Sequence, residues 1–242
     1  MRTTVIKASV AVCRLALLAC ALGTLCSMGA RHSWVLELFS HFSMQYALLA
    51  FIAGVVFAVM KSKPFVILAL MLVIINLFEI APLYAPVDWE DGLQENRLRV
   101  VSFNVLSSNT GYEAAIDFIR EADADVIALY EVDHRWKDAI QKAALPYSMS
   151  IVARMDNFGM AMLSRLPESE MTTQYLGNSE VPSMSLRARY KGLEIALLAI
   201  HPEPPMSAAY AESRNETLDL AGKWAQAQQT LSRKRRANWS SL

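Results

Sequence analysis

Apolar residues are unevenly distributed along this chain of 242 residues. Three long apolar stretches lie before residue 85, at 10–29, 42–60 and 64–84. Each is close to the length of about 20 residues that a helix needs to cross the hydrocarbon core of a bilayer. The 23 acidic and 23 basic residues lie mainly after the third stretch. The pattern therefore predicts three transmembrane helices followed by a water-soluble part.

The boundaries follow from the same pattern. We expect a membrane domain at 1–84, a polar, turn-rich linker at 85–97 and a soluble domain at 98–242. Basic residues flank the start of the first stretch, and Lys61 and Lys63 fill the connection between the second and third. Because basic connections usually stay in the cytoplasm, we expect a multi-pass protein of the cell inner (plasma) membrane with its soluble domain outside the cytoplasm.

The first apolar stretch leaves two alternatives open. Arg2 and Lys7 before it also fit the charged region of a cleaved signal peptide. Leu17-Leu18-Ala19-Cys20 is a loose match to a lipoprotein cleavage box. We favour a retained helix, because two further apolar stretches follow.

Two polar residues, Asn76 and Glu79, interrupt the third stretch. An ionisable residue inside a membrane is a functional candidate by default, so a small transporter built on Glu79 is one interpretation. Glu79 lies only one turn before Pro82, however, near the expected end of the helix. We favour the interpretation that its carboxylate reaches water there.

Strand and helix patterns alternate in the soluble part. Apolar runs at 98–105 and 125–132 flank a stretch at 112–121 with apolar residues at helical spacing, which predicts a βαβ unit with neighbouring parallel strands. Lys191-Gly192 fits a hairpin turn. The further predicted elements are helices at 134–144 and 207–229 and strands at 147–152, 159–164, 182–190 and 193–200. The predicted fold class is α+β.

Each of the first two strands ends in a residue that can bind a metal ion, Asn104 and Glu131. Because the carboxyl ends of neighbouring parallel strands lie at one edge of a sheet, we expect these side chains to be close together. Their oxygens suit a hard cation such as Mg²⁺ or Ca²⁺. A salt bridge from Glu131 to Arg135 or Arg154 is the alternative explanation of a carboxylate at the rim of a core.

His201 ends the apolar strand at 193–200, and Pro202, Pro204 and Pro205 restrict the backbone after it. A histidine held at the end of a strand suits a catalytic role. An exposed loop imidazole is the alternative, and both interpretations stay open at this point.

Four short segments, in this order and spacing, resemble the endonuclease/exonuclease/phosphatase superfamily. They are Ser-Phe-Asn-Val at 102–105, Ala-Leu-Tyr-Glu-Val at 128–132, Gly-Met-Ala-Met-Leu-Ser-Arg at 159–165 and His-Pro-Glu-Pro-Pro at 201–205. The resemblance is closest to membrane-anchored bacterial members. It implies N-terminal transmembrane helices followed by an α+β, DNase I-like four-layer sandwich, and a hydrolase that cleaves phosphate ester bonds with a divalent metal ion.

The resemblance also implies roles by position. Glu131 corresponds to the metal-ligating glutamate, Asn104 to an asparagine that supports the metal and the phosphate, and His201 to a catalytic histidine that hydrogen-bonds the scissile phosphate. Arg214 corresponds less closely to a further phosphate contact. The expected cofactor is Mg²⁺ or another divalent cation such as Ca²⁺ or Mn²⁺. The expected partners are the lipid bilayer and a phosphate ester of unknown identity, with no protein partner.

The second half of the family pattern is missing. The sequence contains neither the Gly-Asp-x-Asn motif that orients the nucleophile nor the terminal Asp-His pair. The 145 residues from Leu98 to Leu242 are about half of the implied domain, so we expect an incomplete, truncated or frameshifted sandwich and an inactive chain. The alternative function is a non-catalytic membrane protein or fragment with a binding role only.

Composition excludes some other classes. A net charge of zero argues against general nucleic-acid affinity, although the basic run at 232–236 fits either a frameshifted end or a patch that binds nucleic acid or lipid head groups. Cys13, Cys20 and Cys26 all lie in the first apolar stretch. The soluble part therefore has no thiolate zinc site and no disulfide framework.

Overall fold

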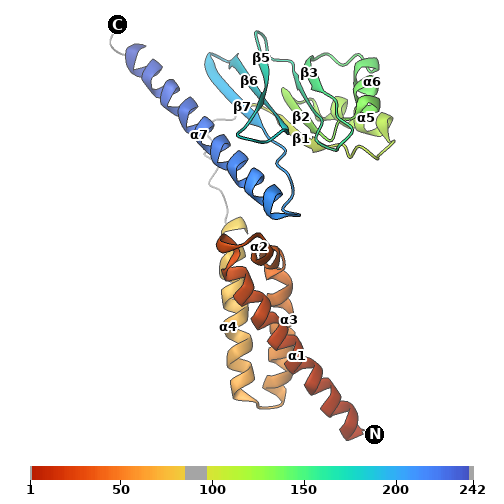
Figure 1. The fold of residues 1–242 in the computed structure, drawn as a ribbon, viewed down its shortest axis with the longest axis vertical. Coiled ribbons are helices and arrows are strands. Elements are labelled where there is room, and N and C mark those ends of the chain that lie inside the picture. The colour runs from red at the N-terminus through yellow and green to blue at the C-terminus, as the bar shows by residue number, and fades with distance from the viewer. Residues whose placement is uncertain (1, 85–96, 240–242) are drawn as a thin grey trace. The chain divides into compact units, whose positions relative to one another are not determined.

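The structure, a computed structural model, describes residues 2–84 and 97–239. The chain forms two compact units, 1–89 and 90–242 (Figure 1). Nearly all of the predicted linker at 85–97 lies outside the described residues.

The N-terminal unit is helical. Its elements are α1 (Arg2–Met28), a 3₁₀ turn (Ala30–His32), α2 (Trp34–Ser40), α3 (Ser43–Val59), α4 (Lys63–Ile80) and a second 3₁₀ turn (Ala81–Tyr84). Among the described residues, the segments Val10–Met28 and Lys63–Tyr84 are each long and apolar enough to cross a membrane. A third span results only if α2 and α3, bent by 54° at their junction, count as one. The predicted number of three is thus the upper limit of what these helices allow.

The helix α2 was not predicted. Ser33 begins it as an N-cap residue, because its side chain accepts a hydrogen bond of 3.3 Å from the Val35 N–H. The bend at 41–42 separates α2 from α3, and the hydropathy pattern places only a connection between spans where α2 lies.

Both polar residues of the third apolar stretch join helices of this unit. The Asn76 Nδ2 group is buried and donates to Thr24 Oγ1 on α1 and to the Leu72 carbonyl, each at 2.8 Å. Glu79 is exposed and accepts a hydrogen bond of 2.9 Å from the Ser43 hydroxyl on α3. Hydrogen bonds of this kind hold apolar helices together where water does not compete for the polar groups.

The first part of the C-terminal unit is a mixed four-stranded sheet with two helices. Its elements are β1 (Val100–Asn104), α5 (Tyr112–Ala122), β2 (Val126–Tyr130), α6 (His134–Lys142), β3 (Ser148–Val152) and β4 (Met160–Ser164). The strand order is β1-β2-β4-β3, with β1 and β2 parallel and the other pairs antiparallel. The predicted βαβ unit is confirmed.

A second, antiparallel sheet follows. It consists of β5 (Glu170–Tyr175), β6 (Pro182–Tyr190) and β7 (Leu193–Ala199), and α7 (Ala208–Trp239) comes after it. The hairpin at Lys191 and Gly192 is confirmed, and both residues have positive φ values, 47° and 81°, as tight hairpin turns require. Strand β5 was not predicted, and α7 extends ten residues beyond the predicted end at 229.

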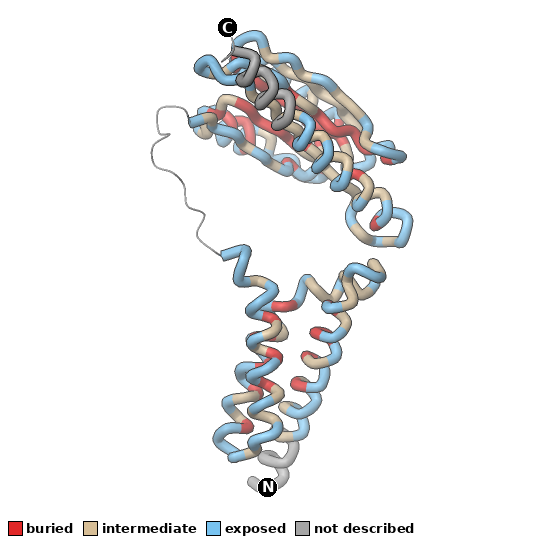
Figure 2. Tube along the Cα trace, turned by 90° about the vertical axis from the view of Figure 1, so that its left-hand side faces the viewer, coloured by how far each residue is buried: buried red, intermediate tan, exposed pale blue. Residues whose placement is uncertain are grey.

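The two sheets and the helices form a mixed α/β sandwich with two apolar layers. One core lies between α5, α6 and the first sheet, and its fully buried members include Ile127, Leu129, Trp136 and Ile140. The other lies between the two sheets and includes Val126, Met160, Met162, Met184 and Leu186. Successive β2 residues alternate between the two cores, as the pleat of a strand dictates. Figure 2 shows buried residues along the strands of this unit. The four-layer count and the incompleteness of the sandwich stay predictions.

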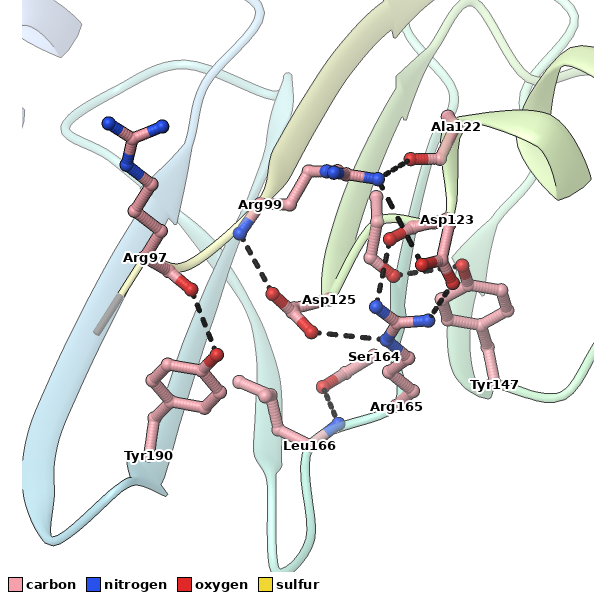
Figure 3. A network of polar contacts seen from close by, with 11 residues as sticks. Arg97, Arg99, Ala122, Asp123, Asp125, Tyr147, Ser164, Arg165, Leu166 and Tyr190 are labelled. Carbon is pink, nitrogen blue, oxygen red and sulfur yellow. Dashed lines mark hydrogen bonds and ion pairs between the residues drawn. The ribbon is translucent and has the colours of Figure 1, made fainter. Parts of the chain in front are cut away.

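A polar clasp holds the ends of the strands that lie away from the predicted site (Figure 3). Arg165, which follows β4, donates to Asp125 Oδ1 at 3.1 Å and to the carboxylate and the carbonyl of Asp123. The Arg99 N–H donates to Asp125 Oδ2 at 2.8 Å. The hydrogen bond and charge of Arg165 lower the pKa of Asp123. The clasp joins the start of β1 and β2 to the end of β4, so it helps to set the register that places Asn104 opposite Tyr130 at the other end.

Candidate metal and phosphate site

Asn104 and Glu131 are in direct contact. Asn104 is the last residue of β1, and Glu131 directly follows β2. The Asn104 Nδ2 group donates a hydrogen bond of 2.6 Å to Glu131 Oε1. The parallel register, which pairs Asn104 with Tyr130, brings the two side chains to the same edge of the sheet.

The carboxamide of Asn104 is held at both ends. Its Oδ1 accepts a hydrogen bond of 2.9 Å from the Leu106 N–H, so its nitrogen faces Glu131. Asn104 therefore orients the Glu131 carboxylate through Oε1. The other oxygen, Oε2, has no hydrogen-bond partner among the described residues and is the oxygen through which Glu131 can bind a cation.

The backbone of Glu131 is strained. Its φ of 61° lies in the left-handed region, which costs a residue with a side chain about 1–3 kcal/mol. Two hydrogen bonds of the next residue hold the chain in this shape: the Val132 N–H donates to the Gly159 carbonyl at 3.0 Å, and the Arg154 N–H donates to the Val132 carbonyl at 3.1 Å. Such strain persists only where the surroundings enforce it, and it is common at functional sites.

Glu131 does not form either of the salt bridges that the sequence left open as an alternative. Arg135 instead pairs with Asp133 at 2.8 Å, and Arg154 pairs with Asp156. Both arginines thus bind a carboxylate two residues away in the chain. The Glu131 carboxylate, 15% exposed, remains directed at Asn104 and His201.

His201 lies beside Glu131, with 4.0 Å between its Nε2 atom and Glu131 Oε1. The imidazole is 25% exposed and is flanked by the rings of Tyr130 and Phe158, with centroid distances of 5.3 and 5.7 Å. Burial lowers the pKa of His201, and Glu131 and the backbone of Asn157 oppose this shift in part. His201 is therefore not a freely exposed loop imidazole.

The loop at 153–159 completes the site, and the sequence analysis named only its Arg154 and Gly159. The Ser107 hydroxyl hydrogen-bonds Asn157 Oδ1, which joins this loop to the one after β1. A Cβ atom on Gly159 would lie 1.9 Å from the Val132 carbonyl oxygen, so only glycine fits there. Gly159 opens one of the four recognised segments, which was the sequence signal for this end of the loop.

Arg214, the residue less closely matched to a phosphate contact, lies on α7. Its guanidinium donates to Asn215 Oδ1 at 2.8 and 3.1 Å.

The donor set fits a hydrated hard cation. The described residues contain no group of three or more His, Cys, Asp or Glu side chains able to hold a metal ion. Mg²⁺ usually keeps several waters and binds one or two carboxylates, and the partly exposed Glu131 with its available Oε2 is compatible with that pattern. A zinc site or a calcium cage built from several protein ligands does not fit these residues.

Comparison with known families identifies the class of protein. Residues 101–232, more than half of the chain, match the Endonuclease/Exonuclease/phosphatase family. The chain therefore belongs to this family, whose members generally use divalent metal ions. Asn104, Glu131 and His201 all lie within the matched residues.

Several solved structures are similar to part of the chain. Truncated TDP2 from Caenorhabditis elegans is 20% identical and aligns over 48% of this chain and 49% of its own, with a TM-score of 0.41. A mannosyl-6-phosphatase from Bacteroides thetaiotaomicron is 15% identical and aligns over 55% of this chain and 60% of its own, with a TM-score of 0.40. An AP endonuclease from Archaeoglobus fulgidus is 19% identical and aligns over 48% of this chain and 47% of its own, with a TM-score of 0.33. The chain spans about half the length of these structures. A comparison with curated proteins found no match.

Proposed function

We propose that this chain is a membrane-anchored, metal-dependent member of the phosphoesterase family whose site binds Mg²⁺ or a similar divalent cation together with a phosphate ester. The observation that carries the proposal is the convergence of Asn104, Glu131 and His201 at one edge of the first sheet, within the residues that match the family.

Each residue has a distinct task in this proposal. Glu131 would hold the cation with its carboxylate, and Asn104 keeps this carboxylate in place. His201 would hydrogen-bond a phosphoryl oxygen of the ester. The cation, when bound, neutralises charge on the phosphoryl oxygens. In the family's reaction the oxygen of water bonds to phosphorus, the ester P–O bond breaks, and the alcohol leaves with a proton.

The residues that would orient and activate this water are absent from the 242 residues, which contain no Gly-Asp-x-Asn motif and no terminal Asp-His pair. Loss of several members of one catalytic unit costs many orders of magnitude in rate. We therefore propose that these 242 residues bind the cation and the ester without measurable turnover. A non-catalytic protein with a binding role only is the alternative, and it does not require the cation to bind at Glu131.

The experiment combines binding and turnover. The full chain in detergent is incubated with Mg²⁺ and bis-p-nitrophenyl phosphate, and both cation binding and release of p-nitrophenol are measured. We expect cation binding that Glu131→Ala abolishes, and no release above the buffer rate. Turnover that Glu131→Ala abolishes would show that the chain is an active enzyme, and cation binding unchanged by Glu131→Ala would refute the site.

Anchoring is proposed from the apolar helices α1 and α4 and the bent pair α2 and α3. The basic residues near the first span and between α3 and α4 favour an extracytoplasmic C-terminal unit. A cysteine introduced at the exposed Leu193 should react with a membrane-impermeant maleimide in intact cells. Reaction only after the cells are opened would contradict this orientation.

A further inference from the structure

Three exposed apolar side chains lie on the loops that form the candidate site. Met206 and Met155, 75% and 72% exposed, are the most exposed large apolar residues among those described in the C-terminal unit. Leu106 is 52% exposed. Leu106 follows β1, Met155 lies between β3 and β4, and Met206 lies in the loop that begins with His201. We call these three residues the apolar rim.

The strand register brings the three loops to one edge. Asn104, Tyr130, Met160 and Val152, which are the site-side ends of β1, β2, β4 and β3, lie in one hydrogen-bonded row. The loop after β1 and the loop between β3 and β4 therefore leave the sheet at this edge, and the hydrogen bond from Ser107 to Asn157 joins them. The third loop reaches the same edge because His201 contacts Phe158 and Glu131.

Leu106 is held rigidly in an unfavourable position for a leucine. Its N–H donates to Asn104 Oδ1, and its carbonyl accepts a hydrogen bond of 3.2 Å from Trp136 Nε1. Its φ of 59° lies in the left-handed region, where glycine or asparagine fits more easily. A leucine that is strained, half exposed and bonded to a site residue is not explained by packing within the described residues. It is explained if its side chain contacts an apolar ligand.

The charges near the site do not suit a long polyanion. Arg135 and Arg154, the two arginines in the segments after β2 and β3, are each paired with a carboxylate of this chain, Asp133 and Asp156. Binding along a nucleic-acid strand relies on several lysines or arginines that neutralise successive phosphates. One phosphate next to an apolar group requires only the site itself and an apolar surface beside it.

We infer that the site takes the phosphate group of a membrane phospholipid, with the apolar rim seated at the level of the acyl chains. The inference rests on the proposed function, because it assigns the ligand class of that site. Methionine side chains are flexible and adapt to irregular apolar surfaces, and two of them together with a leucine at the mouth of the site suit a fluid interface. Binding of the phospholipid needs no bond to be made or broken.

The first experiment uses ³¹P NMR and does not depend on turnover. Mn²⁺ bound at the site broadens the signal of any phosphate held beside it. The full chain is placed in phosphatidylcholine vesicles with Mn²⁺, and Glu131→Gln gives the background. We expect the wild-type chain to broaden the phospholipid signal at least twofold more than Glu131→Gln does.

The rim is tested with the triple variant Leu106→Asn, Met155→Gln and Met206→Gln. With phospholipid vesicles, the triple variant should broaden the ³¹P signal no more than Glu131→Gln does. With soluble glycerophosphocholine and the chain in detergent, its broadening should stay within twofold of the wild type. Equal phospholipid broadening by the triple variant and the wild type would overturn the inference and leave the proposed function intact. Absence of Glu131-dependent broadening with both compounds would overturn the proposed function itself.

A second measurement locates the rim directly. The full chain is used with Cys13, Cys20 and Cys26 replaced by alanine, and a bimane label is attached at Met155→Cys. The control carries the label at Leu193→Cys, because Leu193 is 55% exposed and lies at the end of β7 that is away from His201. Vesicle lipids with spin-labelled acyl chains should quench the Met155 label at least threefold more than the Leu193 label. Equal quenching, or stronger quenching of the Met155 label by aqueous iodide, would place the rim in water and refute the inference.

Discussion

Asn104 and Glu131 share a hydrogen bond of 2.6 Å between the ends of two neighbouring parallel strands. Because the Leu106 N–H also donates to Asn104 Oδ1, two hydrogen bonds of Asn104 orient the pair. This arrangement separates the two tasks of the site: Glu131 can hold a cation, and Asn104 holds Glu131.

Replacing Asn104 by alanine should weaken cation binding through loss of this orientation. Removal of a residue that orients a ligand typically costs about 10–100-fold in metal affinity, and we expect a loss in this range. Mn²⁺ titration of the full chain measures it. Ser102→Ala, on the same strand, is the control and should stay within about twofold of the wild type. Equal affinity of Asn104→Ala and wild type would show that Glu131 needs no orienting partner.

His201 should make the folded chain less stable in acid. Burial holds its pKa below the ordinary value of about 6.5, which the ring recovers in the unfolded chain. As the pH falls below 6.5, the unfolded state takes up the proton before the folded state does, so the free energy of unfolding decreases. His201→Gln should remove this part of the acid sensitivity. Urea unfolding of the wild type and of His201→Gln at pH 7.5 and pH 5 tests this prediction. An equal decrease in the free energy of unfolding of both proteins would contradict the lowered pKa of His201.

Gly159→Ala should disrupt the backbone around the site. The added Cβ atom would overlap the Val132 carbonyl oxygen and lie 2.7 Å from the Arg154 nitrogen, and both are main-chain atoms. Overpacking of this kind costs at least about 1–3 kcal/mol of stability. Gly222→Ala on α7 is the control, because no atom lies within 4 Å of its Cβ position. Urea unfolding should show a loss for Gly159→Ala alone, and faster amide hydrogen exchange should appear at Val132 and Arg154.

Arg165→Met should loosen the clasp at the other end of the strands. Asp125, only 13% exposed, would lose a charged hydrogen-bond donor, which costs about 1–3 kcal/mol. Arg120→Met removes an exposed pair with Asp117 and should change stability by no more than about 0.5 kcal/mol. Comparable unfolding free energies of the two variants would show that the clasp does not stabilise the sheet.

Much of the fold could be predicted because its strands alternate clearly or are continuously apolar. Strand β5 was missed because Glu170–Tyr175 is mostly polar and is defined by its pairing with β6, a long-range contact. The helix α2 was missed because hydropathy averages over a window and does not register a single capping residue, Ser33, at the start of a helix of seven residues. The predicted linker could not be compared, since residues 85–96 lie outside the described part of the chain.

The meeting of Asn104 and Glu131 followed from a general rule about parallel strand ends, and the structure shows the contact. The surroundings of His201 were not predictable in this way. Tyr130 and Phe158 come from different segments, and only the folded chain places both rings against the imidazole. The left-handed backbone of Glu131 gave no sequence signal, because it is imposed by the hydrogen bonds of Val132 with the loop at 153–159.

The most direct measurement for the central claim is Mn²⁺ binding to the full chain, followed by electron paramagnetic resonance and competed with Mg²⁺. The account predicts one site that Mg²⁺ displaces and that Glu131→Gln weakens about 100-fold, whereas Glu170→Gln, an exposed carboxylate at the start of β5, leaves it unchanged. Wild-type affinity in the Glu131→Gln variant would contradict the account, because the cation would then be bound elsewhere in the chain.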